Sequence, residues 1–80
     1  MQVVSITAAY GSAKLPPEVH VAVAATFDEA VLRINMQLRR VFDREIGHRD
    51  GWAYLDLPDT NVRRSTPLGE VVFKVERHAV

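Results

Sequence analysis

The sequence predicts an α+β fold, a two-layer sandwich in which one long helix packs on a mainly antiparallel sheet of about four strands, in the order β-β-α-β-β. The length suits one domain, residues 1–80. Four apolar stretches alternate with the period of a strand, and one longer stretch repeats with the period of a helix. Because one helix covers only one face of such a sheet, the other face is expected to be bare.

Two strands are expected before the helix, at residues 2–8 and 19–25, because apolar side chains alternate along both. Gly11 and the Pro16–Pro17 pair prevent regular structure in the loop between them, residues 10–18. In the first strand, one face carries Val4, Ile6 and Ala8, and the other carries Val3, Ser5 and Thr7. In the second strand, one face carries Val19, Val21 and Val23, and the other carries His20, Ala22 and Ala24.

The helix is expected to begin after Thr26 and to end at Gly47. Its first residues, TFDE, match a capping box, in which Thr26 accepts from the Glu29 amide and Glu29 reaches back to the Thr26 amide. Asp28 adds negative charge where the helix dipole favours it, and Gly47 is a natural left-handed stop. About 20 residues at 1.5 Å each give a helix of roughly 30 Å. The expected core stripe comprises Phe27, Ala30, Val31, Ile34, Leu38, Val41 and Phe42.

Two further strands are expected after the helix. The first is residues 52–57, WAYLDL, which follows a tight turn at residues 47–51. The second is residues 70–77, EVVFKVER. A long loop, residues 58–69, separates them, and loops of this length in compact domains are often functional or else disordered.

Two apolar residues of the helix fall on the side facing away from its core stripe. Leu32 and Met36 lie one turn apart there. Isolated apolar residues are ordinary on a protein surface. A pair flanked by arginines also resembles an interface, where Met and Arg are enriched and Lys is depleted. Plain surface and partner contact are therefore both open for this pair.

The arginines of the helix differ in whether a carboxylate lies one turn away. Ion pairs at i,i+4 spacing, worth a few tenths of a kcal/mol, are expected at two places, Glu29–Arg33 and Arg39–Asp43. Arg40 and Arg44 have no carboxylate one turn before them. These two are therefore the better candidates for contact with an acidic partner or a phosphate.

The bare face of the sheet is a second candidate surface. By alternation it is expected to carry Ser5, Thr7, His20, Trp52, Tyr54, Val72 and Lys74. Trp52 and Tyr54 side by side on an open sheet would stack bases or anchor a protein partner. Burial under the long loop or in a dimer explains them equally well. Arg63 and Arg64, in the middle of that loop, are a third candidate.

Composition and motifs argue against several functional classes. Cysteine is absent, which excludes a disulfide framework and a zinc ribbon, and a net charge of zero argues against bulk electrostatic binding of nucleic acid. The sequence has no nucleophile elbow and no glycine-rich phosphate loop, and its histidines are too scattered for a helical metal pair. We therefore expect no enzyme, no metal and no cofactor. The sequence also has no apolar run of membrane-spanning length and no signal-peptide pattern, which favours a cytoplasmic location without membrane contact. A chain this short is expected to be a monomer or a homodimer.

In size and layout the whole chain resembles the small inhibitors encoded by phages and mobile elements, of which anti-CRISPR proteins are the best-known class. The resemblance implies a non-enzymatic protein-binding module that binds a host protein or ribonucleoprotein complex, such as a CRISPR effector, and blocks its nucleic-acid contacts. The contacts would then be Leu32, Met36, Arg40 and Arg44, or Trp52 and Tyr54. Acidic residues that mimic phosphate are the other option, namely Asp43, Glu45, Asp50, Asp56 and Asp59.

Two other functions stay open. One is a single-stranded nucleic-acid-binding module that uses the open sheet face together with Arg63 and Arg64. The other is a structural or antitoxin-like dimerisation domain, joined through the bare sheet or an edge strand.

Overall fold

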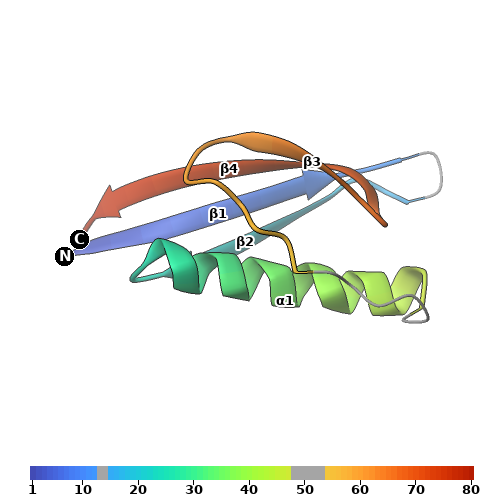
Figure 1. The fold of residues 1–80 in the computed structure, drawn as a ribbon, viewed down its shortest axis with the longest axis horizontal. Coiled ribbons are helices and arrows are strands. Elements are labelled where there is room, and N and C mark those ends of the chain that lie inside the picture. The colour runs from blue at the N-terminus through green and yellow to red at the C-terminus, as the bar shows by residue number, and fades with distance from the viewer. Residues whose placement is uncertain (13–14, 48–53) are drawn as a thin grey trace.

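The computed structural model describes residues 1–12, 15–47 and 54–80, and it has the expected α+β architecture (Figure 1). Four strands and one helix follow in the order β-β-α-β-β, and the open antiparallel sheet has the strand order β2-β1-β4-β3. The elements are β1 (Gln2–Tyr10), β2 (Glu18–Ala24), α1 (Phe27–Glu45), β3 (Val62–Thr66) and β4 (Gly69–Ala79).

The centre of the sheet is the pairing of β1 with β4. The register runs from Gln2 opposite Ala79 to Tyr10 opposite Val71, so the two strands pair over the whole length of β1. The amide of Val80 donates to the carbonyl of Met1 at 2.8 Å. The first and last residues of the chain therefore lie side by side at one end of the sheet (Figure 1).

The helix begins and ends where the sequence predicts. The hydroxyl of Thr26 accepts from the amide of Glu29 at 3.2 Å, and Gly47 adopts φ +95°. The amide of Gly47 donates back to the carbonyl of Phe42 at 3.1 Å. The expected core stripe is confirmed, with Phe27 only partly buried and with Asn35 added to the buried set.

The predicted grouping of side chains along β2 is confirmed, but the prediction that the His20 side of this strand is the bare one was wrong. Ala22 and Ala24 point into the core, whereas Val19, Val21 and Val23 lie on the open face with exposures of 64%, 51% and 48%. His20 consequently lies on the helix side of the sheet, opposite Ala8, and not on the bare face. The helix packs on β2 and β1, and small alanine side chains let it approach the edge strand closely. The valines therefore lie on the bare face, which was predicted to carry His20.

The predicted strand at residues 52–57 was also wrong. Residues 54–57 form no strand, and residues 52 and 53 lie outside the described residues. The predicted loop at residues 58–69 instead contains β3, which forms a hairpin with β4 through Pro67 and Leu68. Gly69 has φ +96° where this hairpin turns. The other two predicted strands, β1 and β4, are confirmed with their buried and exposed faces, and both extend beyond the predicted ranges of 2–8 and 70–77.

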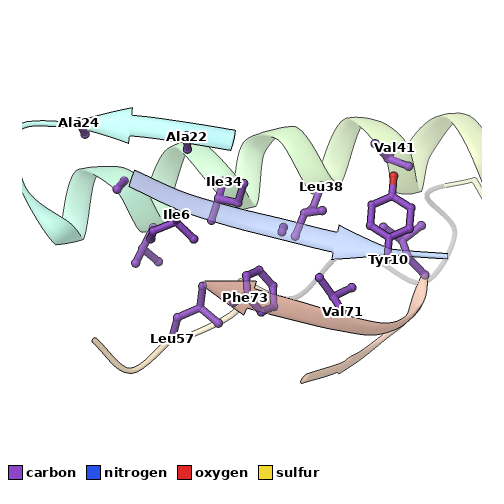
Figure 2. Packing of buried hydrophobic residues seen from close by; sticks show 14 of the residues in the cluster. Ile6, Tyr10, Ala22, Ala24, Ile34, Leu38, Val41, Leu57, Val71 and Phe73 are labelled. Atoms are coloured by element: carbon purple, nitrogen blue, oxygen red, sulfur yellow. The ribbon is translucent and has the colours of Figure 1, made fainter. Parts of the chain in front are cut away.

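The core lies between the sheet and two covering segments (Figure 2). The helix covers β1 and β2 with Ile34, Leu38 and Val41. The extended chain after the helix supplies buried Leu57 and half-buried Leu55 to the same cluster, which also holds Phe73 of β4. One helix is too narrow for four strands, so this segment completes the second layer.

Candidate functional site

Asn35 attaches the extended chain to the helix. Its side-chain nitrogen donates to the carbonyl of Leu55 at 3.1 Å, and its side-chain oxygen accepts from the amide of Leu55 at 2.8 Å. The same nitrogen donates to the carbonyl of Val31 at 2.9 Å. Asn35 is only 4% exposed, so these hydrogen bonds form away from water and are costly to lose. The side-chain amide thus replaces the neighbouring strand that residue 55 does not have.

This attachment places Tyr54 beside the two apolar residues on the outer side of the helix. Leu32, Met36 and Tyr54 are exposed to 51%, 52% and 55%. Together with Asn35 and Arg39 they line a hollow of about 150 Å³. The helix and the extended chain each contribute one wall, so the hollow, here called the helix groove, exists only in the folded protein.

The groove carries a cation that has no carboxylate partner among the described residues. The expected pair of Arg39 with Asp43 is not found there, and Arg39 is one of the residues that line the groove. Arg40, next in the chain, is exposed and equally unpaired within the described part. The expected pair of Glu29 with Arg33 does form, at 2.8 Å. Positive charge is therefore available to a ligand at one end of the groove.

Arg44, which the sequence singled out as free, belongs to a different cluster. Its guanidinium lies 2.9 Å from Glu45 and 3.5 Å from Glu18, and the hydrogen bond to Glu45 raises the pKa of Arg44. Glu18 also accepts a hydrogen bond from the hydroxyl of Tyr10 at 2.5 Å. Two carboxylates thus neutralise Arg44, which is less available to a partner than Arg39 or Arg40.

The Tyr10 side of this cluster is well buried. The rings of Tyr10 and His20 stack with centroids 5.6 Å apart, and the Tyr10 hydroxyl lies 3.0 Å from Nε2 of His20. Burial, then the hydrogen bond and charge of Glu18, raise the pKa of Tyr10. The hydrogen bond from Tyr10 holds the pKa of Glu18 below its usual range. The cluster joins β1, β2 and the helix end, which is a structural role.

The other residues predicted for the site lie apart from the groove. Trp52 lies outside the described residues. Arg63 and Arg64 are in β3, on the far edge of the sheet; Arg63 lies 3.3 Å from Glu70, and no ion pair of Arg64 is found within the described part. Of the predicted set, the structure brings together Leu32, Met36 and Tyr54.

Two residues of the groove were missed by the sequence reasoning. Asn35 lies one turn after Val31 and three residues before Leu38, so a polar side chain at that position of the core stripe was a visible signal. Arg39 was assigned to Asp43 by spacing alone, and spacing does not show whether the pair forms.

Comparison of the chain with protein-family models, with curated proteins and with solved structures finds no match. Within the described residues, no group of three histidine and acidic side chains is placed to hold a metal ion, and no helix is long and apolar enough to cross a membrane. The functional argument therefore starts from the groove.

Proposed function

We propose that this chain is a non-enzymatic protein-binding module whose helix groove receives an apolar side chain of a protein partner, with an acidic residue of that partner next to it. The single observation that supports this is the convergence of Leu32, Met36 and Tyr54 on one hollow beside unpaired Arg39. Tyrosine, methionine and arginine are the residue types that protein interfaces favour. The apolar walls supply the burial, and the arginine supplies orientation.

Charge favours an acidic segment of a protein as the occupant. Arg39 and Arg40 both lack carboxylate partners in the described part of the chain, and a guanidinium binds a carboxylate through two parallel hydrogen bonds. Conversely, two of the acidic residues considered for phosphate mimicry are already paired, Glu45 with Arg44 and Asp59 with Arg77. The cationic groove is therefore preferred over an acidic surface.

The main support for the nucleic-acid-binding alternative was the expected pair of aromatic residues on the open sheet face. This alternative needed Trp52 and Tyr54 on the open sheet, but Tyr54 lies against the helix, on the other layer. Within the described residues the open face carries no Phe, Tyr or Trp; its one aromatic ring is the imidazole of His78, which lies 3.1 Å from the hydroxyl of Ser5. Among the described residues, the open face therefore offers no Phe, Tyr or Trp ring on which a base could stack, and such stacking is the usual source of affinity for single strands.

A more specific version of the proposal is that the module acts as an inhibitor. The resemblance to small phage-encoded inhibitors in size and layout suggests a host defence complex as the target, with binding at the groove blocking the access of nucleic acid. The partner recovered in the experiment below decides between this form and a general adaptor.

The proposal is tested by pull-down from host lysate after nuclease treatment, with bound proteins identified by mass spectrometry. The double variant Leu32→Ala/Met36→Ala removes the apolar walls, and Arg39→Glu reverses the charge. Each is expected to reduce recovery of a stoichiometric partner at least about tenfold, because central hot-spot residues contribute about 2 kcal/mol or more.

Ile46→Ala is the matched control. Ile46 is 52% exposed, like Leu32 and Met36, but it lies at the end of the helix, away from the groove. Recovery should match that of the wild type. A partner retained equally by all variants, or lost on nuclease treatment, would contradict the proposal.

A further inference from the structure

The open face of the sheet exposes valines that no element of the described chain covers. Val19, Val21 and Val23 of β2 are about half exposed or more, and Val72 of β4 is 41% exposed. The helix lies on the opposite face (Figure 1). Valines that follow one another along an uncovered strand are typical of a sheet face that packs on another sheet.

The outer edge of β2 is closed to another strand. The guanidinium of Arg33 donates to the carbonyl of Val23 at 2.6 Å, and the side-chain amide of Gln37 donates to the carbonyl of Val21 at 2.9 Å. Two edge carbonyls are thus occupied by side chains of the helix, which hinders strand addition. In this part of the molecule, association through the face is therefore favoured over association through the edge.

The register of the sheet places complementary residues in neighbouring rows across the open face. One row is Val23, Ser5 and Glu76, since Ser5 pairs with Val23 on one side and with Glu76 on the other. The next row is Val21, Thr7 and Lys74. Each row has a valine, then a hydroxyl residue, then a charge. The two charges are opposite, and Lys74 lies 3.6 Å from Glu76 within the chain.

We propose that this face binds a second copy of the chain. The two-fold axis runs parallel to the sheet and perpendicular to the strands, and it lies between these two rows. Such an axis exchanges the rows, because a two-fold interface is self-complementary. Val21 then meets Val23 of the second copy, Thr7 meets Ser5, and Lys74 meets Glu76. An axis on either row itself would place Lys74 opposite Lys74 or Glu76 opposite Glu76, and an axis on the far side of the Lys74 row would place Lys74 opposite Val72.

The size of the face sets the strength of the dimer. Three strands about 4.8 Å apart and about seven residues long cover roughly 300 Å² in projection. A stable interface buries about 800 Å² of accessible surface per partner. The dimer is therefore weak and reversible, and it leaves the helix groove of each copy free on the outer side.

Sedimentation equilibrium of single and mixed charge variants tests the proposal. Lys74→Glu makes both positions, 74 and 76, acidic, and Glu76→Lys makes both positions basic. Each variant alone is expected to dimerise at least about tenfold more weakly than the wild type, because like charges face one another. An equal mixture of the two is expected to form a dimer again, since the charges then alternate between copies. A change confined to one chain's stability cannot produce this recovery.

Two controls separate the face from general effects of charge. Asp43→Lys makes the same change of charge as Glu76→Lys on the exposed side of the helix and should leave dimerisation unchanged. Val23→Asp should give a monomer whose circular dichroism matches that of the wild type. A wild type that stays monomeric up to about 1 mM, where even a weak interface would be populated, or a mixture that does not recover, would overturn the proposal.

Discussion

The helix groove and the open sheet face expose similar apolar side chains, but they are built in different ways. The groove brings Leu32 and Met36 of the helix together with Tyr54, which follows 18 residues after Met36 in the chain. The sheet face repeats valines at every second residue of one strand. A concave site made from distant segments suits one partner side chain, whereas side chains repeated regularly across a sheet suit a second copy of the chain. Equal exposure therefore does not mean equal function.

The largest expected effect comes from removing the amide that builds the groove. Asn35→Ala leaves the amide and the carbonyl of Leu55 without their buried partner, which should lower the free energy of unfolding by about 2–3 kcal/mol. Urea denaturation measures this change. The groove should be lost with it, while the sheet face should not change.

Asn61→Ala is the control for Asn35→Ala. The side chain of Asn61 accepts one exposed hydrogen bond from the amide of Val75 at 2.9 Å, so its loss should cost less than about 1 kcal/mol. Equal effects of the two substitutions would contradict the role given to Asn35.

A smaller effect tests which face of β2 is buried. Ala22→Val adds volume where the helix packs closely on β2, and it should lower the free energy of unfolding by about 1–3 kcal/mol. Val21→Ala changes the opposite, exposed face and should stay within about 0.5 kcal/mol in dilute protein. Thermal unfolding of both variants shows which substitution destabilises the protein more. A larger loss of stability for Val21→Ala than for Ala22→Val would mean that the valines face the core.

The smallest effect is the dependence of stability on pH at Glu18. Its pKa is lowered in the folded protein, chiefly by the hydrogen bond from Tyr10. The stabilisation is therefore present above the ordinary carboxyl pKa and is lost as the pH falls through the lowered value. Glu18→Gln and Tyr10→Phe should both flatten the fall in the urea midpoint below about pH 5. An unchanged slope in both variants would argue against this hydrogen bond.

Local sequence signals predicted the parts of the fold that depend on neighbouring residues. The capping residue Thr26 and the stop at Gly47 act through hydrogen bonds within a few residues, and alternation assigned the faces of β1 and β4 correctly. The faces of β2 depend on how closely the helix approaches, which alternation does not contain. Alanine and valine both suit a core, so the choice between them is made by the space left by the helix.

One strand was missed and another was predicted where residues 54–57 form none, because strand pairing depends on residues elsewhere in the chain. Leu55 and Leu57 alternate as in a strand, but the partner of Leu55 is the side chain of Asn35. The strand β3 has exposed side chains, and its regular backbone is supplied by pairing with β4. Leu32 and Met36 were predicted for the site, whereas the position of Tyr54 in it required the fold.

The most direct test of two separate surfaces is photo-crosslinking from one position on each. A photoreactive amino acid is placed at Met36 or at Val21, and the protein is irradiated in nuclease-treated host lysate. The account predicts that the probe at Met36 links a different polypeptide and that the probe at Val21 links a second copy of the 9.0 kDa chain. A second copy linked at Met36, or the same foreign polypeptide linked from both positions, would contradict it.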